Sequence, residues 1–120
     1  MKGSGHLGLE RRLERLTGEA GGTRARNLQS LAQSVREDAV FREFLQRARS
    51  LGDEKRLLAA VLLKRRAEMC ACEIQAALGL SHATVNHHMN ILLEAGIVTA
   101  QKRGKWLYYR LTPEASHDIP

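Results

Sequence analysis

The sequence predicts a mainly α-helical chain with a small β-hairpin, organised as a winged helix-turn-helix preceded by N-terminal helices. Three observations predict this class. Two helix-like runs, 72–78 and 82–95, are joined by the short connection Gly-Leu-Ser. The stretch 98–111 then changes to the alternation of strands and holds an Arg-Gly pair suited to a tight turn. Upstream, apolar residues recur at helical spacing within 24–50.

Composition limits the class of protein further. The chain has 120 residues, of which 43% are hydrophobic and only 4% aromatic, so a small core must be mostly aliphatic. The net charge of +6 suits a polyanionic partner. No stretch approaches the roughly 20 apolar residues that span a bilayer, and residues 1–12 lack a secretory signal. We therefore expect a cytoplasmic protein with no membrane partner and with reduced thiols.

The N-terminal part is expected to hold helices of different length. Residues 1–22 are interpreted as a short helix, Leu9–Leu16, within a flexible N-terminal segment that is rich in glycine. Residues 23–50 are expected to be mostly helical, because apolar residues recur every three or four positions. The apolar stripe shifts near Asp38, so a bend or a new helix should begin there.

Residues 51–114 are expected to form the winged helix-turn-helix domain, followed by a flexible C-terminal end, 115–120. Local signals mark the helix ends. Asp53 can cap the first helix of this domain, Gly79 can end the next one, and Ser81 can cap the third.

The helix over residues 82–95 has two different faces. Val85, Met89 and Leu92 share one side, while the opposite side is polar and carries no charge before Glu94. Such a side can be merely solvated. In a helix-turn-helix, however, the second helix can enter the major groove, where amides pair with adenine and small side chains meet thymine methyl groups. The candidate base-reading residues are His82, Ala83, Thr84, Asn86, His87 and Asn90.

The hairpin over residues 98–111 favours the DNA interpretation. It carries several basic residues and no acidic one. A basic hairpin beside a helix-turn-helix is typical of a winged helix, whose wing lies along phosphates. The candidate phosphate-contacting residues are Lys102, Arg103 and Lys105. We therefore expect duplex DNA as the partner.

The stretch 51–114 resembles the arsenic-responsive (ArsR/SmtB) winged-helix repressors. Four parts carry the resemblance: "LGDEKRL", "CACEIQAALGLS", "TVNHHMNILLEAGIV" and "GKWLYYRL". The resemblance implies a transcriptional repressor that sits on an operator as a homodimer and is released by an effector. Because one recognition helix reads only a few base pairs, we expect the operator to be pseudo-palindromic.

Two departures from the family bear on the dimer. The family usually continues after the wing into a last helix that helps dimerisation and often carries metal ligands, whereas this chain stops at "ASHDIP". Its first 50 residues are longer than usual. We therefore expect residues 23–50 to be a helical dimerisation segment. The alternative is a helical layer on the core of the single chain.

The only two cysteines, Cys70 and Cys72, lie in "EMCACEI". By resemblance this stretch matches the family's sensing box Glu-Leu-Cys-Val-Cys-Asp-Leu. A thiol at a helix N-terminus is expected to have a lowered pKa, and thiolates react with soft metals, arsenite and oxidants. Residues two apart should point to nearly opposite sides, so one ion could join both sulfurs only if the helix start unwinds.

The ligand set of this pair is small. The family's third arsenite-binding cysteine corresponds to Gln75, which excludes a three-sulfur site within one chain. A four-coordinate zinc site would need histidines or a partner chain. We therefore expect no definite cofactor, and consider a soft metal or metalloid ion at Cys70 and Cys72, or thiol oxidation, as the effector signal. The alternative is that both cysteines are small packed hydrophobes.

No catalytic pattern stands out, since the sequence has no Ser-His-Asp or paired-carboxylate spacing and no glycine-rich phosphate loop. We expect no enzyme. The favoured function is a sequence-specific DNA-binding transcriptional regulator, a repressor released by an effector. The alternative is a winged helix that serves as a protein–protein interaction module without its own operator. His88 is interpreted as a packed side chain rather than a ligand.

Overall fold

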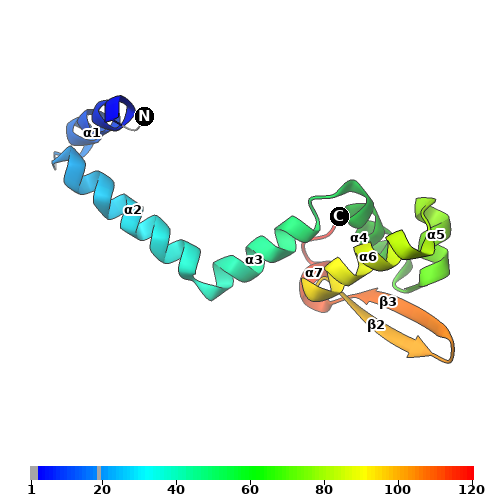
Figure 1. Cartoon of the computed structure of the whole chain (residues 1–120). Helices are drawn as coiled ribbons and strands as arrows, with labels where there is room; N and C mark the ends of the chain where they lie inside the picture. Colours follow the sequence, from blue (N-terminus) through cyan, green and yellow to red (C-terminus); the bar gives the residue numbers. More distant parts are fainter. Residues whose placement is uncertain (1–2, 19) are drawn as a thin grey trace. The chain divides into compact units, whose positions relative to one another are not determined.

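The computed structural model describes residues 3–18 and 20–120, with side chains described from Gly8 onward within those ranges. The chain divides into two compact units, one up to Arg42 and one from Glu43 to Pro120. The described residues are mostly helical and include a small antiparallel sheet, so the predicted fold class is confirmed (Figure 1). Within these ranges no helix is both long and apolar enough to cross a membrane.

The first unit consists of α1 (Gly3–Thr17), α2 (Gly21–Glu37) and the start of α3 (Ala39–Ser50). Helix α1 begins earlier than the predicted Leu9–Leu16 and packs against α2. Gly21 permits this close approach, because a Cβ atom at that position would lie 1.9 Å from the carbonyl oxygen of Glu10.

Asp38 separates α2 from α3, where the sequence predicts a bend or a new helix. Its carboxylate accepts hydrogen bonds from the backbone N–H groups of Val40 at 2.8 Å and Phe41 at 3.2 Å. These bonds satisfy N–H groups that lack a partner within the first turn of α3. Several large apolar side chains of α2 and α3 remain exposed: Leu28, Leu31, Val35, Val40, Phe41 and Phe44.

The second unit contains the rest of α3, the helix-turn-helix and the sheet. Its further elements are α4 (Glu54–Arg66), β1 (Met69–Cys70), α5 (Ala71–Leu78), α6 (His82–Glu94), β2 (Val98–Arg103), β3 (Trp106–Leu111) and α7 (Pro113–Ser116). Asp53 caps α4 as predicted, since its carboxylate accepts from the N–H groups of Lys55 at 2.8 Å and Arg56 at 3.1 Å. The largest fully buried side chains come from α4, α5, α6, β3 and the start of the wing: Leu63, Ile74, Val85, Met89, Leu92, Ile97 and Tyr109.

Strands β2 and β3 form the predicted hairpin. Arg103 pairs with Trp106, so Gly104 and Lys105 make the turn, one residue later than the predicted Arg103-Gly104 turn. Gly104 has a φ of 61°, which explains why a glycine occupies the first position of this turn.

The two-residue strand β1 is not predicted by the sequence. Met69 pairs with Tyr109, and Cys70 pairs with Tyr108, which makes β3 the central strand of the order β1-β3-β2. The residues that precede α5 are therefore hydrogen-bonded to the wing.

The C-terminal end differs from the expectation of a flexible segment at 115–120. Ala115 and Ile119 are buried in the core of the second unit. The Thr112 hydroxyl caps α7 by accepting from the N–H of Ala115 at 3.2 Å, and Pro113 fits the first turn. Two buried apolar residues, Ala115 and Ile119, thus fix an otherwise mostly polar end.

Candidate nucleic-acid interface and thiol pair

The connection between α5 and α6 sets the start of α6. Gly79 adopts the left-handed conformation at φ 67°, and its N–H donates to the carbonyl of Gln75 at 2.9 Å. The Ser81 hydroxyl accepts from the N–H of Thr84 at 3.2 Å and donates to the Thr84 hydroxyl at 2.9 Å. Both predicted caps are therefore present.

Helix α6 presents the two faces that the sequence predicts. Val85, Met89 and Leu92 are buried. All six candidate base-reading side chains are exposed: His82, Ala83, Thr84, Asn86, His87 and Asn90. The face is polar and lacks an acid before Glu94, so a groove edge or a phosphate could approach it without repulsion from a carboxylate.

His88 is connected to the core side of the unit. The Arg56 guanidinium donates to Nδ1 of His88 at 3.2 Å, and the Nε–H of Arg56 donates to the carbonyl of Ser50 at 2.6 Å. Because arginine only donates, Nδ1 accepts and the ring proton lies on Nε2. His88 therefore links α6 to α4, which agrees with its interpretation as a packed side chain.

The wing carries two kinds of basic residue. Lys102 and Lys105 are exposed, and no ion pair of the described residues involves them. The Arg103 guanidinium instead forms an ion pair with Glu68 and lies 4.4 Å from the ring centroid of Tyr108. Arg103 is therefore partly neutralised within the chain, unlike the two lysines.

Glu68 was missed by reasoning from the sequence. Arg110 also pairs with it, at 3.1 Å. Hydrogen bonds from Arg103 and Arg110 hold the pKa of Glu68 below its ordinary value, and Glu68 raises the pKa of Arg103. Glu68 lies 35 residues from Arg103, so no local pattern joins them. Residues 98–111 contain no acidic residue, but the wing has an acidic partner in Glu68.

The two thiols lie together. The Sγ atoms of Cys70 and Cys72 are 2.8 Å apart, which corrects the expectation that the side chains point to opposite sides. Cys70 is the N-cap of α5, with an extended backbone (φ −81°, ψ 162°). The helical spacing rule does not apply to a residue outside the helix, so no unwinding is needed to bring the sulfurs together.

The expected lowering of a thiol pKa by the helix N-terminus is wrong for Cys70. Burial raises the pKa of the Cys70 thiol, and the hydrogen bond with Cys72 raises it further. The Glu73 carboxylate, which accepts from the Cys70 N–H at 2.8 Å, adds a nearby negative charge. Cys72, by contrast, is exposed. The pair thus combines one buried protonated thiol with one accessible thiol.

The donor set near the thiols is limited. Among residues 3–18 and 20–120, no group of three or more His, Cys, Asp or Glu side chains could hold a metal ion. The chain therefore offers two sulfurs at this point. Thiolates are ligands that soft ions prefer, whereas a tetrahedral zinc ion would need two ligands from elsewhere.

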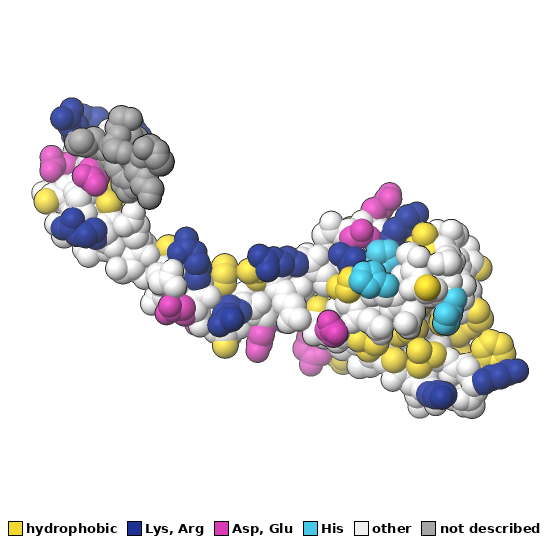
Figure 2. Space-filling view, in the orientation of Figure 1, with side chains coloured by type: hydrophobic (Ala, Val, Ile, Leu, Met, Phe, Trp, Pro, Cys, Tyr) yellow, Lys and Arg dark blue, Asp and Glu magenta, His cyan; other side chains and the backbone are white. Residues whose placement is uncertain are grey.

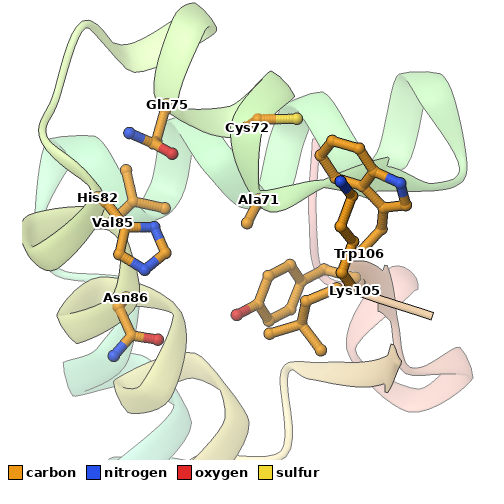
Figure 3. Close-up of a pocket in the computed structure, with 10 residues that line it drawn as sticks. Ala71, Cys72, Gln75, His82, Val85, Asn86, Lys105 and Trp106 are labelled. Atoms are coloured by element: carbon orange, nitrogen blue, oxygen red, sulfur yellow. The ribbon is translucent and has the colours of Figure 1, made fainter. Parts of the chain in front are cut away.

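A cavity of about 240 Å³ lies between α5, α6 and the wing. Figure 3 shows Gln75, His82 and Asn86 on one side of it, and Cys72, Lys105 and Trp106 on the other. No local sequence pattern indicates this cavity, because its walls come from three separate elements.

Comparison with known proteins identifies the chain. The family model described as "Bacterial regulatory protein, arsR family" matches residues 53–100. The arsenical resistance operon repressor of Bacillus subtilis (strain 168) is 31% identical over 75 residues, which cover 62% of this chain and 71% of that protein. The chain belongs to the arsR family. The arsenic resistance transcriptional regulator ArsR1 of Pseudomonas putida KT2440 is 42% identical over 64 residues, covering 53% of this chain and 50% of that protein.

Solved structures of other transcriptional regulators agree with this chain in fold. The transcriptional regulator HlyU from Vibrio vulnificus CMCP6 is 26% identical, with a TM-score of 0.59, and the match covers 78% of this chain and 91% of that one. The winged helix-turn-helix domain of Mb0332 from Mycobacterium bovis, described as homodimeric, has a TM-score of 0.63 at 22% identity, covering 70% of this chain and 78% of that one. This arsR-family chain spans about half the length of the first curated relatives that it matches.

Proposed function

We propose that the chain is a sequence-specific, duplex-DNA-binding transcriptional repressor that acts as a homodimer in the cytoplasm and is released by an effector. One observation carries the proposal: the capped helix α6 exposes a polar face that has no acid before Glu94, next to a wing with two exposed lysines. The membership of this chain in the arsR family supports the same function.

In this proposal α6 reads bases in the major groove. Asn86 and Asn90 are suited to bidentate pairing with adenine, and Ala83 can meet a thymine methyl group. His82, Thr84 and His87 complete the base-reading face. Val85, Met89 and Leu92 anchor the helix in the core, so the reading side chains project from a rigid support.

The wing is proposed to lie along the phosphates. Lys102 and Lys105 supply charge that no described ion pair offsets. Arg103 contributes less, because Glu68 already accepts its hydrogen bonds. Phosphate contacts add affinity without adding sequence preference.

Homodimerisation is proposed to use residues 23–50. Leu31, Val40 and Phe44 are 60%, 74% and 57% exposed, and Figure 2 shows hydrophobic side chains at the surface of α2 and α3. Large apolar side chains that stay in water at helical spacing suit burial against a second copy. A symmetric dimer would place two α6 helices on half-sites about one helical turn, or a multiple of it, apart.

The thiol pair is proposed to receive the effector signal, as a soft metal or metalloid ion or as an oxidant. Cys70 belongs to β1, which pairs with β3 of the wing, and it also caps α5 of the helix-turn-helix. A change at the sulfurs therefore acts on both DNA-binding elements at once. The accessibility of Cys72 favours a sensor over two packed hydrophobes.

The experiment is selection of duplexes from a random-sequence pool with the full chain, followed by competition against unselected duplex. A pseudo-palindromic motif should be enriched, and its affinity should fall steeply with salt. A chain that enriches no motif and shows no salt-dependent binding would contradict the proposal and leave the protein–protein module as the better interpretation.

A further inference from the structure

The cavity between α5, α6 and the wing is larger than a packing defect. Its volume of about 240 Å³ corresponds to roughly eight water molecules at about 30 Å³ each. It is somewhat smaller than the roughly 300 Å³ at which pockets for drug-sized ligands begin. The space therefore suits a molecule built on a single small ring.

Apolar groups form much of its wall. Ala71 comes from α5, Val85 from α6, and Trp106 and Leu107 from β3. Trp106 contributes its indole ring, with the Lys105 ammonium group 5.5 Å from the ring centroid, and it is half exposed, so a ligand can reach it from solvent. A flat aromatic wall with aliphatic neighbours recognises a planar ring by stacking and by apolar burial.

Tyr109 gives the cavity a polar group without a partner. The residue is only 1% exposed, and it lines the cavity. Among the hydrogen bonds of the described residues, none reaches its hydroxyl, and burial alone raises the pKa of this phenol. The hydroxyl is not one of the buried polar atoms that lack a partner, so it opens onto the cavity, where it can donate a hydrogen bond to an acceptor of the ligand.

The other polar groups in the lining define the charge of the ligand. Gln75 and Asn86 carry amide donors, and Lys105 carries an ammonium group. No carboxylate among the described side chains lines the cavity. Amide hydrogen-bond donors and one ammonium group, without a carboxylate beside them, favour an anionic ligand over a cationic one.

We propose that this cavity binds a small aromatic carboxylate, with its ring against Trp106 and its carboxylate among Tyr109, Lys105 and the amides. Cys72 of the thiol pair also lines the cavity, but the proposed contacts to the ligand do not use its sulfur. Since His82, Asn86 and Lys105 belong both to the cavity and to the proposed DNA-binding face, occupancy lowers DNA affinity. This regulatory consequence rests on the proposed function, whereas ligand binding does not.

Benzoate is the probe, and Trp106 is the reporter because it is the only tryptophan in the chain. Titration of the full chain should give a saturable change in tryptophan fluorescence. Saturation-transfer NMR should show magnetisation passing from the protein to the benzoate ring. Benzylamine, which has the same ring and the opposite charge, should bind at least tenfold more weakly.

Two variants test the site, and one serves as a control. Tyr109→Phe removes only the hydroxyl and should weaken benzoate binding about fivefold, the size of one net hydrogen bond. Ala71→Leu fills the cavity and should abolish binding. Tyr108→Phe removes a hydroxyl that does not line the cavity and should bind like the wild type. Circular dichroism and thermal unfolding check that each variant is folded.

The results that overturn the proposal are distinct from failure of the proposed function. No saturable signal by either method, equal binding of benzylamine, or undiminished binding by folded Ala71→Leu would each refute the site. If benzoate binds but leaves the Kd for the selected duplex unchanged, the regulatory consequence is wrong. If no duplex is selected at all, the fluorescence and NMR titrations still decide whether the cavity binds the carboxylate.

Discussion

The Glu68 carboxylate accepts hydrogen bonds from the Arg103 guanidinium, so an acid just before β1 holds a cation at the end of β2. Arg110 shares the same carboxylate. An acid next to the proposed phosphate-binding wing opposes DNA in two ways, by its own charge and by occupying Arg103.

Glu68→Gln should therefore strengthen binding to duplexes of every sequence, by roughly threefold to tenfold at low salt. It should also steepen the salt dependence, since about one more phosphate contact becomes available. Fluorescence anisotropy at several salt concentrations measures both effects. Glu114→Gln removes the same charge from α7 and is the control. If both variants change affinity equally, the Glu68–Arg103 pair does not restrain the wing.

The same pair predicts a pH dependence of stability. The pKa of Glu68 is lowered in the folded state by hydrogen bonds from Arg103 and Arg110. A carboxylate of this kind stabilises the fold above its unfolded pKa, and this contribution is lost as pH falls through the folded pKa. The difference in melting temperature between wild type and Glu68→Gln should therefore be present at neutral pH and shrink below about pH 4. A difference that stays constant across this range would contradict the prediction.

Asn86→Ala and His87→Ala should weaken binding to the selected duplex far more than binding to random DNA. Loss of one bidentate base contact costs about 1–3 kcal/mol. Lys102→Ala and Lys105→Ala should weaken both kinds of binding equally and reduce the salt slope by about one each. Competition anisotropy with selected and random duplexes separates the two patterns. Equal losses on both duplexes for all four variants would remove the assignment of α6 as the reading helix.

The exposure of the two cysteines predicts an order of reaction. Cys72 should be alkylated by iodoacetamide well before Cys70, because Cys70 is buried and its raised pKa keeps it protonated. The Cys72→Ser variant retains only Cys70, and the Cys70→Ser variant retains only Cys72. Mass spectrometry of the peptide that spans positions 70 and 72 therefore gives the alkylation rate of each thiol separately. Faster alkylation of Cys70 would show that the pair is arranged differently in solution.

The effector proposal has its own test. Arsenite, cadmium, copper(I) or peroxide should lower the affinity of the wild type for the selected duplex, and the double variant Cys70→Ser/Cys72→Ser should lose that response. Binding is measured by anisotropy before and after each addition. If none of the four reagents changes the affinity of the wild type for the selected duplex, the cysteines have a structural role only.

The exposed apolar residues of α2 and α3 predict a charge-sensitive dimer. Val40→Asp should lower dimer affinity at least tenfold, because a carboxylate would be buried in the proposed interface. Sedimentation equilibrium measures the effect. Gln29→Asp adds the same charge at an exposed polar position of α2. A Val40→Asp chain that dimerises as tightly as this control would place the interface elsewhere.

The sequence predicts the helix-turn-helix well because its signals are local. Asp53, Gly79 and Ser81 each act within a few residues, and the alternation over 98–111 depends on neighbours along one strand. The apolar period of α6 also identifies its buried side chains correctly.

The features that the sequence does not predict depend on contacts between residues that lie far apart in the chain. Strand β1 has only two residues and exists because β3 pairs with it. Glu68 meets Arg103 across 35 positions, and Ile119 is buried by elements far upstream. The Cys70 prediction failed for another reason: a helical period was applied to a residue that lies just outside the helix.

Strand β2 is one of the two outer strands in the sheet order β1-β3-β2, and its residues after Val98 are exposed. An outer strand is a template on which another molecule can add a strand, and charged side chains are a common protection against such association. Lys102 and Arg103 at the end of β2 would then keep the free protein from aggregating edge to edge. Variants that neutralise them should lose colloidal stability as well as DNA affinity, so light scattering has to accompany every binding curve measured on the wing.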